Sequence, residues 1–326
     1  MLVLFAHLCG TMYFLPTSFA IAFGDLGNFG VRIFFVISGF LITSLLLNEY
    51  KNTGQISLYN FYMRRLLRIF PAFYFFIAFL ALWSFYRFIE LNTNDLWFAV
   101  TYMSNYHRNG SWYVGHLWSL AVEEQFYILW PLVLVLGGPT KGKIFIVLAV
   151  LLGPAFRIIA WKYFPNWRGF SGKTFPTIFD AIATGCLLAY VRIYLHQYKG
   201  YLKFQRSYFF ALIPLLAIFG LMTSTKFYGI SSHLRESAIN IAIALCIDRA
   251  VSISDGFVSH ILNSKLFEKI GILSYSLYLW QQIFLNRNST HWVARFPINI
   301  ILTVLAAILS YKLIEVRFLK QKNRYR

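Results

Sequence analysis

Charged residues are scarce in this chain. Of its 326 residues only 13% are Asp, Glu, Lys or Arg, whereas 58% are hydrophobic and 20% are aromatic. Soluble globular domains usually have about a quarter of their residues charged, so this composition excludes an ordinary soluble protein. Apolar runs of roughly 20 residues, the length that crosses a bilayer as a helix, recur from end to end. The sequence therefore predicts an integral membrane protein without a sizeable soluble domain.

Acidic residues are the rarer of the two charge types, with 12 Asp and Glu against 30 Lys and Arg and a formal net charge of +18. In multi-pass membrane proteins, basic residues collect in cytoplasmic loops, so the charge does not require nucleic acid as a partner. If the first helix runs outward, the loops on the cytoplasmic side hold the denser basic set, which includes Lys51, Arg64, Arg65, Arg68 and the tail KQKNRYR. We therefore expect a cytoplasmic C-terminus, a lipid bilayer as the surroundings and no nucleic acid partner.

Cysteine is also sparse. Cys9, Cys186 and Cys246 lie far apart in apolar surroundings, without CxxC spacing. This pattern excludes a disulfide framework and favours packing roles for the three side chains. We assign no metal ligands from the sequence.

The apolar runs predict an all-α fold of about ten transmembrane helices around a central cavity. The expected spans are 1–22, 29–48, 66–86, 118–137, 143–161, 176–195, 207–224, 235–250, 269–286 and 295–315. The segment 95–103 is too short to cross and is expected to be interfacial or re-entrant. We find no internal repeat or linker, so residues 1–326 are expected to form a single integral-membrane domain. The chain opens on LVLFAH without a basic flank, and we expect a first helix shortened at its N-terminus or a missing upstream piece.

Ionisable side chains inside a bilayer are costly, so each one is a candidate for function. His7 is either a neutral packing residue whose imidazole donates one hydrogen bond, or a general base. Glu123 and Glu124 are consecutive and point about 100° apart on a helix, so we expect one to be functional and the other to lie at the rim. Glu123 shares a helical face with Ser119 and Tyr127. It either faces a wet cavity or pairs with a buried cation such as Arg32 and holds two helices in register.

Two further sets of polar residues need an explanation. Arg65 and Arg68 are three residues apart on one helical face, where they either anchor the topology or bind an anion that carries phosphates. Asp180 lies inside an expected span and either links helices or lines a cavity. Glycines around the second span, such as Gly39, are expected to let helices approach closely.

Five segments together resemble the acyltransferase family 3 membrane proteins, the bacterial O-acyltransferases. They are GNFGVRIFFVISGFLITSLLL, FYMRRLLRIFPAFYF, HLWSLAVEEQFYILWPL, FDAIATGCLLA and IGILSYSLYLWQQIF, and they occur in the family's order over nearly the whole chain. Two departures are Arg32, where many members have aspartate, and Ile283, where many have proline. Family members also usually have an arginine about ten residues before the first-helix histidine, a position that would precede Met1.

The resemblance implies a ten-helix enzyme of the bacterial inner membrane that modifies polysaccharides. It would move an acyl group, commonly acetyl, from cytoplasmic acyl-CoA to a hydroxyl of O-antigen, peptidoglycan, exopolysaccharide or an oligosaccharide. No permanently bound cofactor is implied, because acetyl-CoA or another acyl-CoA serves as the donor substrate. By motif, His7 and Glu123 would be catalytic and Arg65 and Arg68 would meet the coenzyme A phosphates. Ser119, Asp180 and Arg32 would line the substrate site or its cavity.

Two other functions stay open from the sequence. A transporter or flippase could use the same buried histidine and acids to relay protons or to coordinate a solute. An inactive, truncated acyltransferase would still fold. The paired arginines at the end of a span favour the enzyme, because transport alone does not call for them.

Overall fold

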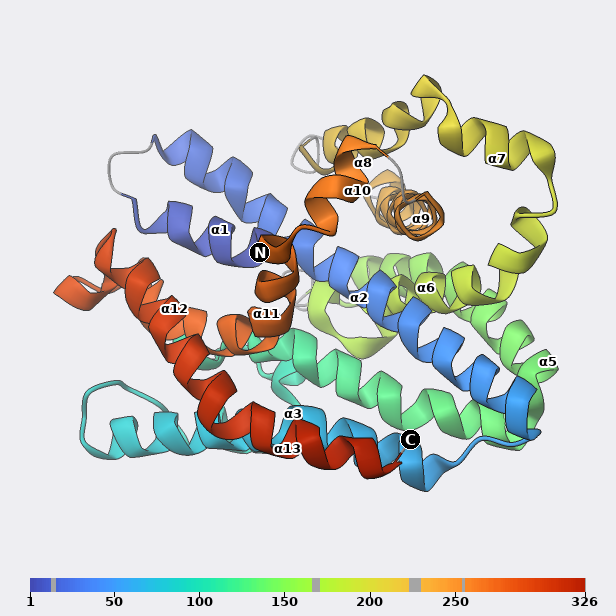
Figure 1. Cartoon of the computed structure of the whole chain (residues 1–326). Helices are drawn as coiled ribbons and strands as arrows, with labels where there is room; N and C mark the ends of the chain where they lie inside the picture. Colours follow the sequence, from blue (N-terminus) through green and yellow to red (C-terminus); the bar gives the residue numbers. More distant parts are fainter. Residues whose placement is uncertain (13–15, 166–170, 223–229, 254–255, 326) are drawn as a thin grey trace. The chain divides into compact units, whose positions relative to one another are not determined.

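The computed structural model describes residues 1–12, 16–165, 171–222, 230–253 and 256–325, and throughout these ranges the regular structure is helical, without a strand (Figure 1). The α-helices are α1 Leu2–Gly10, α2 Thr17–Thr53, α3 Leu58–Phe85, α4 Thr93–Val100, α5 Leu117–Tyr163, α6 Phe175–Leu195, α7 Lys199–Arg206, α8 Leu212–Met222, α9 Ile230–Ser252, α10 Phe257–Leu262, α11 Lys265–Phe284, α12 Ile298–Ser310 and α13 Val316–Lys322. A π-helical turn, Tyr311–Glu315, joins α12 to α13. The predicted all-α class is confirmed.

Five helical segments of the described chain are long and apolar enough to cross a membrane. They are Leu26–Thr53, Leu58–Phe85, Trp112–Tyr163, Phe175–Leu195 and Ile298–Lys322. The pair Lys199–Arg206 and Tyr208–Leu221, bent by 69°, adds a sixth if it forms one broken span. The protein is thus a multi-pass membrane protein, as predicted.

The structure corrects the first expected span. Residues 1–22 do not form one helix, because α1 ends at Gly10 and α2 begins at Thr17. Pro16 stands directly before α2, and its ring removes a backbone donor that a continuous helix would need. The expected spans 118–137 and 143–161 are both helical within α5 and are separated at Gly138, whose φ of 69° breaks the helix. The short helix α4 confirms that 95–103 cannot cross alone.

The chain divides into two compact units. Unit 1 comprises Met1–Asn28, Ser57–Ala121 and Ser264–Arg326, and unit 2 comprises Phe29–Ile56 and Val122–Asn263. The expectation of a single domain stays a prediction.

Unit 1 is built around α3 and α11. Its core contains Phe73, Phe76, Leu120 and Trp280 among its buried side chains. α12 packs on α11, and α13 packs on α3 (Figure 1). At the end of α1, Asn299 of α12 donates a hydrogen bond of 2.8 Å to the Thr11 hydroxyl, and α1 contacts α11. These contacts fix the helix that carries His7.

Unit 2 contains a crossing of α2 and α6 in which the two backbones touch. A Cβ atom added at Gly39 would overlap the backbone carbonyl of Ile182, and one added at Gly185 would overlap the carbonyl of Val36. Small residues allow this approach, which gives close van der Waals contact between helices inside a membrane. The prediction that Gly39 permits close helix approach is confirmed.

We expect the substitution Gly39→Ala to destabilise the protein by about 1–3 kcal/mol, because the added methyl group must push two packed backbones apart. Gly200→Ala is the matched control, since a Cβ added at Gly200 meets nothing within 4 Å. The free energy of unfolding, measured by denaturant titration in mixed micelles, should fall for G39A and stay near the wild-type value for G200A. Equal stability of the two variants would contradict the observed crossing.

Candidate functional site

His7 lies in unit 1 within a group of aromatic and polar side chains from three segments. Its ring centroid is 5.4 Å from that of Trp112, and the Arg287 guanidinium lies over the same Trp112 ring, 5.5 Å from its centroid. Gln281 and His116 are also near enough to interact with the imidazole. The Nδ1 atom of His7 is buried and has no hydrogen-bond partner within the described part of the chain. The imidazole therefore retains an unused polar atom inside the protein.

A second histidine, His116, is held in a defined tautomer beside His7. The Gln282 side chain has one oxygen, Oε1, that lies 2.9 Å from the His116 backbone nitrogen and 2.6 Å from its Nδ1. Because the backbone N–H can only donate and the amide oxygen can only accept, Nδ1 must carry a hydrogen. In the neutral ring Nε2 is then the proton acceptor.

The Nε2 atom of His116 has no hydrogen-bond partner among the described residues, although the side chain is only 3% exposed. The Leu279 carbonyl lies near the ring but does not meet hydrogen-bond geometry with this atom. The Gln281 Oε1 atom is likewise buried without a partner in the described chain. Buried polar atoms are rarely left unpaired unless a ligand, a water or a catalytic role accounts for them. His7, His116 and Gln281 thus form a polar group suited to binding and deprotonating a hydroxyl.

Ser119 lies next to His116 and takes part in its hydrogen bonds. Its hydroxyl lies 2.5 Å from the Tyr278 hydroxyl and 3.2 Å from the His116 carbonyl, to which it donates. Tyr278 also donates to the His116 carbonyl, at 2.9 Å. Trp112 donates from Nε1 to the Gln282 carbonyl at 2.9 Å. These bonds fix the start of α5 on α11 and hold His116 in place.

Glu123 is buried in unit 2, where Ser38 of α2 and Tyr127, one turn further along α5, both donate hydrogen bonds to its Oε1. The bond to Tyr127 confirms that these two residues share a helical face. Glu124 is buried as well, with 8% exposure, and the expectation that it lies at the rim stays a prediction. Glu123 and His7 belong to different units, and the expectation that they act on one substrate stays a prediction.

Asp180 forms a bidentate ion pair with Arg157, with distances of 2.7 and 3.0 Å to the two guanidinium nitrogens. Its Oδ2 also accepts from Ser237 at 2.9 Å and from Asn240 at 3.3 Å. Asp180 is 0% exposed. Such pairing compensates the cost of burying the charge and links α5, α6 and α9.

Arg32 joins the other side of this network. It forms an ion pair of 2.6 Å with Glu236 and donates to the Asn240 side chain at 3.2 Å. Glu236 in turn lies 3.4 Å from Nε of Arg157. The predicted cavity residues Asp180 and Arg32 thus meet in one network, in which each has protein partners that account for its burial.

Arg65 and Arg68 lie on α3, as predicted, together with Arg64. Arg64 donates a hydrogen bond of 2.7 Å to the Tyr325 carbonyl, and Arg65 lies 5.9 Å from the Phe61 ring centroid. Arg68 is exposed and is near enough to Glu315 for electrostatic attraction. The three cations thus have different surroundings, which makes Arg64 a useful reference for the other two.

Sequence reasoning missed His116, Trp112, Gln281, Gln282 and Arg287. Their motifs were recognised, but the pairing of the α5 start with the end of α11 depends on tertiary contacts across more than 160 positions. A usable signal was present, because HLWS and YLWQQ each place polar side chains in an apolar run. Among the described residues, no group of three or more His, Cys, Asp or Glu side chains could hold a metal ion.

The comparisons with known proteins bear on this group of residues. The sequence model of the acyltransferase 3 family, described as an acyltransferase domain, matches residues 1–314. The chain belongs to this family. It is 33% identical over 333 residues to the O-acetyltransferase OatA of Staphylococcus aureus strain NCTC 8325 / PS 47, with 90% of this chain and 53% of the relative covered.

A second relative gives the same coverage. A putative O-acetyltransferase of Staphylococcus aureus strain COL is 30% identical over 347 residues, again covering 90% of this chain and 53% of its own length. The chain thus spans about half the length of these curated relatives. No solved structure matches it. The predicted family is confirmed, and with it the membership of this chain among acyltransferases.

Proposed function

We propose that this chain is a bacterial inner-membrane O-acyltransferase that moves an acetyl group from cytoplasmic acetyl-CoA to a hydroxyl of a cell-surface or exported carbohydrate. The observation that carries the proposal is the pair of histidines, His7 and His116, each with a buried ring nitrogen that has no hydrogen-bond partner among the described residues, in a chain similar to O-acetyltransferases over 90% of its length. O-antigen, peptidoglycan, exopolysaccharide and oligosaccharides all offer suitable hydroxyls. The proposed topology has ten membrane crossings and a cytoplasmic C-terminus.

The proposed reaction needs a base, an acid and a site for the donor. His7 takes the proton from the acceptor hydroxyl as its oxygen attacks the thioester carbonyl. The carbon–sulfur bond then breaks, and the coenzyme A sulfur leaves with a proton returned by the imidazolium. His116, whose free atom is an acceptor, binds or orients the hydroxyl, and Ser119 fixes the backbone that carries it. In a second version of the chemistry, the imidazole of His7 attacks the thioester itself and passes the acyl group on.

Glu123 and the cations of α3 have separate roles in this proposal. Glu123, held by Ser38 and Tyr127, orients the acceptor or the imidazolium. Arg65 and Arg68 bind the phosphates of coenzyme A, because guanidinium groups form charge-assisted and often bidentate hydrogen bonds with phosphate. Asp180 and Arg32 form part of the cavity wall.

Membranes that contain the protein, incubated with acetyl-CoA labelled in the acetyl group, test the proposed function. Transfer of the label to glycan, absent from membranes without the protein, supports it. Solute uptake without acyl transfer would instead support a transporter, the main alternative. No transfer and no uptake, with the protein folded, would indicate an inactive acyltransferase.

The double substitution Arg65→Gln and Arg68→Gln is expected to raise the KM for acetyl-CoA roughly 10²- to 10⁴-fold, because each of the two lost charge-assisted hydrogen bonds is worth about 1.5–3 kcal/mol. The amount of protein in the membrane should change little. Arg64→Gln is the control, since the Arg64 guanidinium is already bonded to the Tyr325 carbonyl. If all three arginines only anchor the topology, R64Q and the double variant will lower the amount of inserted protein alike and leave the KM unchanged.

A further inference from the structure

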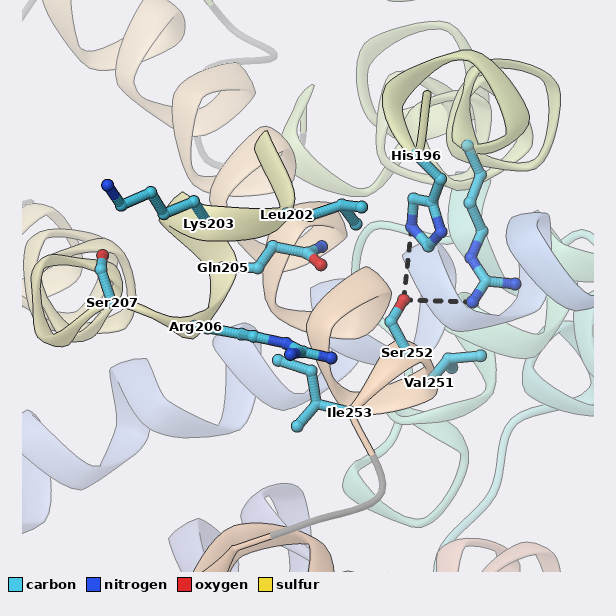
Figure 2. A pocket seen from close by; sticks show the side chains of 10 residues that line it. His196, Leu202, Lys203, Gln205, Arg206, Ser207, Val251, Ser252 and Ile253 are labelled. Atoms are coloured by element: carbon cyan, nitrogen blue, oxygen red, sulfur yellow. Dashed lines mark hydrogen bonds between the residues drawn. The ribbon is translucent and has the colours of Figure 1, made fainter. Parts of the chain in front are cut away.

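A pocket of about 780 Å³ lies in unit 2, and its lining includes none of the residues assigned to acyl transfer. It is lined by the end of α6, by α7 and by the end of α9 (Figure 2). Arg192, His196, Lys203 and Arg206 bring basic groups to it, and Gln205 and Ser252 bring neutral polar groups. Among the described residues, the lining has no acidic side chain, which favours an anionic ligand.

The floor of the pocket is held by Asp248, which is 0% exposed. Its carboxylate accepts hydrogen bonds from Nε of Arg192 at 2.7 Å, from the Tyr201 hydroxyl at 2.7 Å and from Gln205 at 2.7 Å. Nε2 of His196 lies 3.1 Å from the same group. This buried acid fixes the surrounding side chains and balances the charge of one cation, Arg192.

Two cations of the pocket are not balanced in this way. Lys203 and Arg206 are exposed, and neither forms an ion pair within the described part of the chain. Figure 2 shows Arg206 extending from α7 toward Ile253, while Ser252 is bonded to His196 on the neighbouring wall. The described side chains of the pocket therefore carry a net positive charge, and the guanidinium of Arg206 and the ammonium of Lys203 are available as donors.

The pocket lies at the end of a candidate membrane span. α6 is a candidate span that ends at Leu195, and the pocket begins at its last turn with Arg192 and His196. The short helix α7 has basic residues on one face and is flanked by exposed aromatic side chains, Tyr198 at one end and Tyr208 at the other. Basic helices of this kind lie in the interface, and tyrosines concentrate at the level of the headgroups.

We propose that this pocket binds the phosphate of an anionic phospholipid headgroup, with Arg206 and Lys203 as its ligands and the side chains fixed by Asp248 as its floor. Basic pockets between helices at a membrane surface recognise such headgroups, and each Lys or Arg strengthens the attraction severalfold. The assignment does not depend on acyl transfer, since it uses none of the residues proposed for that reaction.

Native mass spectrometry of the full chain in detergent, with added phosphatidylglycerol or chain-matched phosphatidylcholine, tests the proposal. The wild type should retain phosphatidylglycerol in preference to phosphatidylcholine. Arg206→Gln should weaken phosphatidylglycerol binding about fivefold, and adding Lys203→Gln should weaken it further by a similar factor. Lys199→Gln removes the same charge from the same helix but lies outside the pocket, and it should leave binding unchanged.

Three results would overturn the assignment. If K199Q weakens binding as much as R206Q, the effect is general surface attraction and not this pocket. If the wild type does not distinguish the two lipids, the pocket binds no anionic headgroup. If excess coenzyme A displaces the lipid from the wild type and R206Q abolishes the displacement, the phosphate belongs to a nucleotide and not to a lipid.

Discussion

Replacing His7 by alanine is expected to lower O-acyl transfer about 10²- to 10⁴-fold, the usual contribution of a positioned general base. Its Nδ1 atom is buried without a partner in the described chain, so the substitution breaks no hydrogen bond from that atom. The protein should therefore remain folded and inserted. The measurement is transfer of labelled acetyl groups to glycan, normalised to the amount of folded protein in the membrane.

Two further variants separate chemistry from packing at this group. His291→Ala removes an exposed histidine of the same unit and should leave transfer unchanged. His116→Asn places an amide N–H near the position of Nδ1, so it can still donate to Gln282, but it removes Nε2. We expect H116N to be folded and to lose activity. Undiminished transfer by H7A would exclude His7 as the base, and undiminished transfer by H116N would leave His116 with a structural role only.

Replacing Asp180 by alanine is expected to destabilise the protein by about 3–5 kcal/mol, the cost of leaving one member of a buried ion pair without its partner. Arg157, which is 3% exposed, would lose both bonds of the bidentate contact and retain only neutral partners and the more distant Glu236. Loss of monodisperse protein on heating, measured by size-exclusion chromatography, reports the effect. D180A should elute as aggregate at temperatures where the wild type remains intact.

The double variant Arg157→Met with Asp180→Leu is the matched control, because it removes both charges and keeps apolar bulk in the site. Replacement of a buried pair by apolar residues is often neutral for stability, so the double variant should recover most of the loss. If it is stable and transfers acyl groups, Asp180 only links helices. A stable D180A variant without activity would contradict the packing argument and support the role of Asp180 in the substrate cavity.

The helical segments could be read from the sequence because long apolar runs have few alternatives in a membrane. α6 is found at Phe175–Leu195 where a span was expected at 176–195, α9 covers its expected range, and α11 ends two residues before the end of its own. α9 and α11 form despite charged residues near their ends, and they are not among the segments apolar enough to count as candidate spans. The break before α2 was missed because hydropathy averages over Pro16.

The candidate site could be predicted only in part. The free-energy cost of placing ionisable groups inside a membrane was enough to identify His7, Glu123, Arg32 and Asp180 as candidates. All four have specific polar or aromatic neighbours. The partners of these residues could not be predicted, because each partner is contributed by a distant segment. Arg32 was considered as a partner for Glu123, yet it is paired with Glu236 of α9. Which polar residue meets which follows from helix packing, and local sequence does not encode it.

Because of the π-helical turn Tyr311–Glu315, the orientation of α13 depends on the number of residues in that turn. A π turn contains one residue more than the α turn it replaces, and that residue rotates everything after it by about 100°. Here the turn brings Glu315 to the Ser276 hydroxyl and sets the face that α13 presents to α3. Deleting one residue from the turn would restore a regular helix but carry the face of α13 away from α3, so at this position length is constrained more tightly than residue identity.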